Sequence, residues 1–195
     1  MSRCTSDVAR RVPRARRRWL AAAAALLLLP VARPATGADT PIEYQVKAAF
    51  LLNFARFTEW PPAAFSSADA PIQICVLREN PFGEILSETI RQETAGGRPL
   101  RARIIDSFPE AERCHLLFVP RGQTRRAAPL IARPAPLVTV GESSDFLQAG
   151  GTINLFLEDG RVRFAINQEA AARQGVRFSS HLLRLARTPD AGRPQ

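Results

Sequence analysis

The chain has 195 residues and a formal net charge of +9, from 27 lysines and arginines against 18 acidic residues. Eight of the arginines and one aspartate lie in the first 38 residues, so that segment carries +7 of the charge and the remainder only +2. A nearly neutral body without a basic patch interleaved with aromatic residues excludes nucleic acid as a partner. The remaining length suits one domain with its own hydrophobic core.

Residues 1–38 have the three parts of a cleavable secretory signal. A cationic stretch is followed by an apolar run over 19–29 and then by small residues. The apolar run is shorter than the roughly 20 residues that a membrane-spanning helix needs. We therefore expect cleavage and export, a folded domain over 39–188, and a disordered tail over 189–195.

Two cysteines, Cys75 and Cys114, remain once Cys4 has left with the signal. In an oxidising compartment an isolated pair is expected to form a disulfide. The bridge would close a loop of about 40 residues and stabilise the fold by about 4 kcal/mol in the chain-entropy model. Because the spacing differs from the Cys-x-x-Cys of redox pairs, we expect a structural bond.

The first predicted element is a helix from Pro41 to Trp60, where two prolines end the helical spacing of apolar residues. Its aromatic stripe consists of Phe50, Phe54, Phe57 and Trp60. Core packing is the simpler interpretation of the stripe, and a face offered to a partner is the alternative.

The following segments alternate between strand and helix. The short β-branched run 70–77 predicts a strand, and after the turn 80–83 the segment 84–93 predicts a helix. Polar and apolar residues alternate over 99–105, which favours a strand at the edge of a sheet.

Two continuous apolar runs, 114–119 and 137–141, predict buried strands of a parallel sheet. A helix is expected between them over 123–131. A further short helix is expected to begin at 144–147, before two glycines interrupt the pattern.

Segments 152–157 and 162–166 flank an Asp-Gly turn and predict a hairpin. Two helices capped by Asn167 and Ser179 follow. The order of elements predicts an α/β domain, a three-layer Rossmann-like sandwich. Its sheet would be mainly parallel, with an antiparallel hairpin near the C-terminus and helices on both faces.

Groups for catalysis or metal binding are sparse in this sequence. His115 and His181 are its two histidines, and neither has further ligands at metal-binding spacing, so we interpret both as structural. The segment 141–145 resembles a nucleophile elbow, but Asp145 stands where that motif needs glycine. We therefore predict no enzyme activity, no metal and no cofactor.

Loops at the carboxyl edge of an open α/β sheet are the usual place for a ligand. The candidate rim of such a pocket consists of Asn80, Phe82, Gly83, Gly141 and Ser144. A plain turn is the alternative for 80–83, because one glycine is far short of a phosphate-binding motif.

The helix Tyr-Gln-Val-Lys-Ala-Ala-Phe-Leu-Leu-Asn-Phe-Ala-Arg-Phe-Thr-Glu-Trp-Pro over 44–61 is the most distinctive part of the sequence. The other distinctive segments, in chain order, are 74–77, 80–83, 114–119, 138–141, 146–147, 150–151, 162–167 and 179–186. Together these segments resemble the YfiR-like family of periplasmic proteins. The resemblance spans about 44–186.

The resemblance implies a periplasmic regulator that binds the periplasmic part of an inner-membrane diguanylate cyclase or sensor protein. The regulator would repress the cyclase and lower cyclic-di-GMP until an envelope signal or an outer-membrane lipoprotein removes it. A homodimer is left open, and a periplasmic small-ligand sensor or carrier without a cyclase partner is the alternative function. For the partner surface we predict Arg56 and Phe57 on the first helix and Arg161 at the hairpin tip.

Overall fold

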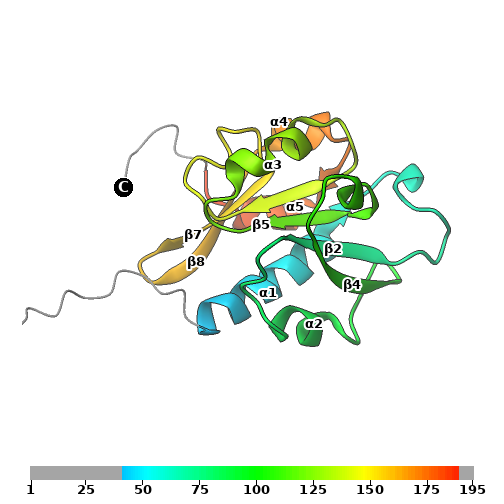
Figure 1. The fold of residues 1–195 in the computed structure, drawn as a ribbon, viewed down its shortest axis with the longest axis horizontal. Coiled ribbons are helices and arrows are strands. Elements are labelled where there is room, and N and C mark those ends of the chain that lie inside the picture. Colours follow the sequence, from blue (N-terminus) through cyan, green and yellow to red (C-terminus); the bar gives the residue numbers. More distant parts are fainter. Residues whose placement is uncertain (1–40, 189–195) are drawn as a thin grey trace, which may run out of the picture. The chain divides into compact units, whose positions relative to one another are not determined.

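Strands and helices alternate along residues 41–188, the part of the chain that the computed structural model describes (Figure 1). The helices are α1 (Pro41–Phe57), α2 (Ile85–Ile90), α3 (Thr124–Ala132), α4 (Gln168–Arg173) and α5 (Ser180–Leu185), with 3-10 turns η2 (Pro62–Ala64) and η3 (Pro109–Arg113). The strands are β1 (Thr58–Glu59), β2 (Ile72–Leu77), β3 (Thr94–Ala95), β4 (Arg98–Ile105), β5 (Leu116–Val119), β6 (Val138–Gly141), β7 (Ile153–Glu158), β8 (Arg161–Ile166) and β9 (Arg177–Phe178). The predicted signal over 1–38 and tail over 189–195 lie outside the described residues.

A seven-stranded mixed sheet forms the centre of the described domain. Its order is β3-β4-β2-β5-β6-β7-β8. The five central strands, β4, β2, β5, β6 and β7, run parallel, whereas the outer strands β3 and β8 are antiparallel to their neighbours. The predicted mixed α/β class and the two buried parallel strands are confirmed. The chain moves from β2 outward to β4 and then back past β2 to β5, so the order of strands reverses between β2 and β5.

Side chains of β2 alternate between two hydrophobic clusters, one on each face of the sheet. Ile74 and Val76 join the larger cluster, which contains buried residues of α1, α2 and α5. Cys75 and Leu77 join the smaller cluster, to which α3 contributes. Figure 1 shows α1 and α2 on one side of the strands and α3 on the other. The three-layer prediction therefore holds in part, because the two faces are covered unequally.

The first helix ends at Phe57, three residues before the predicted end. Thr58 donates its hydroxyl to the Phe54 carbonyl at 2.6 Å. Thr58 and Glu59 then form β1, which pairs antiparallel with β9. The predicted helical position of Trp60 is wrong, because pairing with a segment far away in the sequence outweighs the local helical pattern.

The helix expected at 144–147 is not formed, and hydrogen-bonded turns occupy the segment. The ring of Phe146 is fully buried and lies directly over two glycines. An ideal Cβ would come within 2.3 Å of this ring at Gly141 and within 2.2 Å at Gly151. The tight chain path around an inserted aromatic ring therefore replaces a regular helix.

The predicted hairpin and both helix caps are confirmed. Strands β7 and β8 pair antiparallel, and the turn residues Asp159 and Gly160 both have positive φ, at 50° and 70°. Two consecutive positive φ angles are typical of the type I′ turn that Asp-Gly favours. The side chains of Asn167 and Ser179 accept hydrogen bonds from the first turns of α4 and α5.

Candidate functional site

The disulfide joins β2 to the segment that leads into β5. Cys75 and Cys114 are both buried, and their Cα atoms are 5.9 Å apart. The parallel pairing of β2 with β5 brings them together. The predicted Cys75–Cys114 bond is confirmed.

A buried ion cluster links α1 to the loop after β6. Lys47 is only 1% exposed, and its ammonium lies 2.6 Å from the Glu43 carboxylate, one helical turn away. The same ammonium donates to Glu142, whose side chain is 2% exposed. One cation therefore lies between two carboxylates, away from water.

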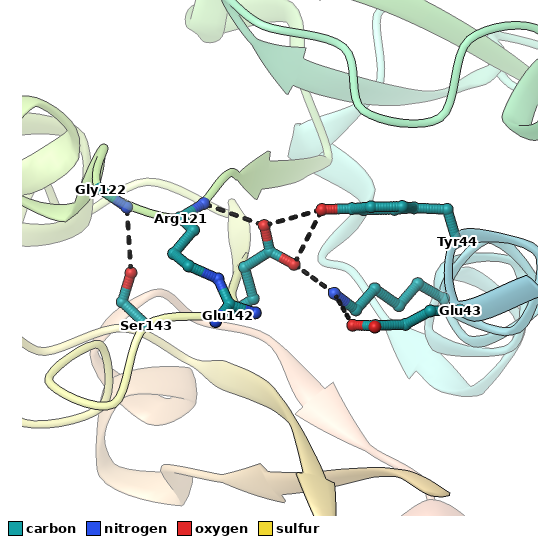
Figure 2. Close-up of polar contacts among 7 residues, drawn as sticks. Glu43, Tyr44, Arg121, Gly122, Glu142 and Ser143 are labelled. Atoms are coloured by element: carbon teal, nitrogen blue, oxygen red, sulfur yellow. Dashed lines mark hydrogen bonds and ion pairs between the residues drawn. The ribbon is translucent and has the colours of Figure 1, made fainter. Parts of the chain in front are cut away.

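Two further donors hold the Glu142 carboxylate in place, as Figure 2 shows. The Tyr44 hydroxyl donates to it at 3.2 Å, and the backbone N–H of Arg121, which follows β5, donates at 2.9 Å. Nearby, the Gly122 N–H is 3.4 Å from the Ser143 hydroxyl oxygen. Helix α1 is thereby attached to the loops that follow β5 and β6.

This cluster lies at the carboxyl ends of parallel strands, next to the place where the strand order reverses. Open α/β sheets usually bind ligands in the crevice at that position. Here the ring of Tyr44 packs edge-on against Phe82, with centroids 5.2 Å apart, and Phe82 in turn contacts Phe118 of β5. The first helix therefore fills this edge of the sheet with its own side chains.

The predicted pocket-rim residues have separate surroundings. Asn80 closes its own turn, donating to the Gly83 carbonyl and accepting from the Phe82 N–H. Gly141 is covered by a phenylalanine ring, and Ser144 is exposed. Other residues line the cavity beside His115 and a pocket at the end of α2.

Two of the predicted partner residues, Arg56 and Phe57, lie at the end of α1, and the third lies on the hairpin. Arg56 forms an ion pair with Glu93 and donates to the Thr94 carbonyl at 3.3 Å. Phe57 is half-buried and contacts the His181 ring at 5.3 Å between centroids. Arg161 is exposed at the tip of the hairpin.

His115 is the buried histidine of the domain, and both its ring nitrogens have partners. Nδ1 accepts from the Gln73 N–H at 3.1 Å, so Nε2 carries the proton and donates to the Ala64 carbonyl, also at 3.1 Å. Burial lowers the pKa of the imidazole; the Ala64 carbonyl opposes this effect and Arg98 adds to it. The geometry supports the structural interpretation of His115.

A cavity of about 200 Å³ adjoins this histidine at the amino ends of β5 and β6. Its lining consists of Ala63, Ala64, Ala111, Glu112, Arg113, Cys114, His115, Leu130, Arg133, Ala135, Pro136 and Leu137. Within the described residues, no three or more His, Cys, Asp or Glu side chains are grouped so as to hold a metal ion. No helix of residues 41–188 is both long and apolar enough to cross a bilayer.

Sequence reasoning missed Lys47 and Glu142. A signal for Lys47 existed, because it shares a helical stripe with Tyr44, Leu51 and Phe54, all of which are buried. Glu142 directly follows the buried strand β6. Their pairing could not be predicted, since 95 residues separate them.

The fold and the site together define a mixed α/β domain in which the first helix covers the edge of the sheet where such folds usually bind ligands. The model of the YfiR/HmsC-like family matches residues 44–187. The chain therefore belongs to this family, whose members are periplasmic regulators of cyclic-di-GMP signalling. None of the curated proteins matches the chain.

Proposed function

We propose that the protein is exported to the periplasm, binds the periplasmic part of an inner-membrane diguanylate cyclase, and holds the enzyme inactive. The family match over 44–187 carries this proposal, because it covers nearly all of the described domain. Repression would lower cyclic-di-GMP. An envelope signal or an outer-membrane lipoprotein would remove the regulator and free the cyclase.

The geometry of the sheet edge favours a protein partner over a small ligand at the strand ends. A ligand at the rim of Asn80 and Phe82 would have to displace Tyr44, which is 5% exposed and bonded to Glu142. Displacing it would also remove a hydrogen-bond donor from the buried Glu142 carboxylate, which is costly for a buried charged group. The outer surface of α1 and of the hairpin needs no such rearrangement.

The proposed partner surface includes the end of α1, at Arg56, and the tip of the hairpin, at Arg161. The hairpin is attached to the helix because Phe164 of β8 packs against Phe50 and Phe54 of α1, with ring centroids 5.4 and 5.1 Å apart. Phe57 contributes only its half-exposed face, because the rest of the ring packs against the core.

Deletion of the gene, with cyclic-di-GMP measured in the cells, tests the proposal. We expect cyclic-di-GMP to rise on deletion and to fall again when the intact gene is supplied. Unchanged cyclic-di-GMP after deletion would refute repression. In parallel, the purified protein should capture a membrane cyclase from detergent-solubilised inner membrane.

Substitutions then test the surface. Arg161→Ala and Arg56→Ala should restore high cyclic-di-GMP without loss of folded protein, whereas Arg184→Ala, an exposed arginine on α5, serves as the matched control. Phe57→Ala also removes core contacts, so its thermal unfolding must be compared with that of the intact protein. Full repression by all the surface variants would place the interface elsewhere.

A further inference from the structure

The outer edge of β4 is open over most of its length. On one side β4 pairs with β2 from Leu100 to Ile105, but on the other side β3 pairs only with Arg98 and Pro99. Among the described strands, none lies outside residues 101–105. A strand edge with unpaired backbone groups is a template for another extended chain.

The direction of the backbone groups follows from one hydrogen bond. The Ile105 carbonyl accepts from the N–H of Arg78, the residue after β2, at 2.8 Å. Ile105 therefore directs its backbone groups inward, toward β2. Since successive residues of a strand alternate, Ala102 and Ile104 direct their N–H and C=O groups to the open side.

The opposite edge of the sheet, at β8, is partly covered by the chain itself. There the segment after α5 lies parallel to β8, with a bridge between Ala165 and Arg187. The Arg187 N–H donates to the Phe164 carbonyl at 2.8 Å. The chain thus occupies part of its β8 edge itself, which leaves the β4 edge as the better template.

Charge along β4 selects the kind of strand that fits. The strand contains Arg98, Arg101 and Arg103 and no acidic residue. An antiparallel second copy centred on Ala102 would set Arg101 opposite Arg103, and like charges directly opposite each other destabilise a sheet. Acidic side chains at the same positions would be attracted instead.

The two faces of the open edge differ in character. Arg101 and Arg103 point to one face, where the Arg103 guanidinium also forms an ion pair with Glu110 at 3.7 Å. Ala102 and Ile104 point to the other, and the Ile104 side chain is 49% exposed. The nearby Phe108 is 41% exposed and adds apolar surface beyond the end of the strand. A strand with acidic side chains on one face and apolar ones on the other matches this edge.

We infer that the open edge of β4 docks an extended segment of a partner protein in which acidic and apolar side chains alternate. The segment pairs with the backbone of Ala102 and Ile104, sets its acidic side chains beside Arg101 and Arg103, and lays its apolar side chains beside Ile104. This site is distinct from the α1 and hairpin surface and does not require the partner to be a cyclase.

Binding of a short blocked peptide with alternating glutamate and valine tests the inference. The protein is expressed from the full chain, and peptide binding is followed by fluorescence anisotropy. Arg101→Glu with Arg103→Glu should weaken binding about tenfold, at up to about 1 kcal/mol for each cross-strand charge pair. Ala102→Pro should abolish it, because this proline removes only an outward-facing N–H.

Matched controls separate the edge from general charge effects. Arg125→Glu with Arg126→Glu reverses two exposed charges on α3 and should leave binding unchanged. The peptide with lysine in place of glutamate should not bind. Should Ala102→Pro fail to fold, the double Arg→Glu variant of β4 still decides the matter.

Three results would overturn the inference. The first is no binding of the acidic peptide, and the second is equal binding of the acidic and basic peptides. The third is a homodimer, seen by sedimentation, that Ala102→Pro dissociates, because the edge would then belong to a second copy. None of these readouts involves cyclic-di-GMP, so failure here is distinguishable from failure of the proposed repression.

Discussion

Removal of the Lys47 charge should destabilise the fold far more than loss of a surface ion pair. The Lys47→Met variant keeps the apolar stem of the side chain but leaves Glu43 and Glu142 without their shared cation. Lys47 is 1% exposed, and the Glu142 side chain 2%. Breaking a buried pair costs about 3–5 kcal/mol, because the remaining charge is uncompensated. That is a large part of the roughly 5–15 kcal/mol that holds a domain folded.

Urea unfolding at neutral pH measures this loss. With a slope of about 2 kcal/mol per molar urea, the midpoint should fall by about 2 M. Adding Glu142→Gln to Lys47→Met should recover part of the stability, because a neutral amide oxygen can still accept from the Arg121 N–H. Arg56→Met is the control: its ion pair with Glu93 is more than a third exposed, and such pairs contribute about 0–1 kcal/mol. If Lys47→Met costs no more than Arg56→Met, the buried cluster does not anchor α1 as we describe.

Three further predictions concern the core. Cys75→Ser should lower the free energy of unfolding by about 2–5 kcal/mol, and reductant should lower the melting temperature of the intact protein but not that of the variant. Burial lowers the pKa of His115 from 6.5, so its contribution to the free energy of unfolding should be complete above about pH 6.5 and should decline as the pH falls through the lower folded-state pKa. If the free energy of unfolding depends on pH in the same way in His115→Phe, this prediction is wrong. Gly151→Ala should destabilise by about 1–3 kcal/mol, since its Cβ would overlap the Phe146 ring, and Phe146→Leu should relieve that penalty in thermal unfolding.

The sequence by itself determined those elements whose causes are local. Continuous apolar runs located β5 and β6, a short β-branched run located β2, and alternation of polar and apolar residues located β4. The Asp159-Gly160 pair located the hairpin, because a type I′ turn needs two residues that tolerate positive φ. Asn167 and Ser179 marked the starts of the last helices, since a side chain in that position caps the next turn.

The tertiary structure decided what depends on distant segments meeting. The end of α1 was fixed by the pairing of Thr58 and Glu59 with β9, and the loop after β6 by the wedge of Phe146 between two glycines. Lys47 shares a helical stripe with buried residues, but its partner Glu142 lies 95 residues away and came to it only through the fold. The energy of the contact between Lys47 and Glu142 depends on burial and on a partner far away in the sequence, so only the three-dimensional structure reveals it.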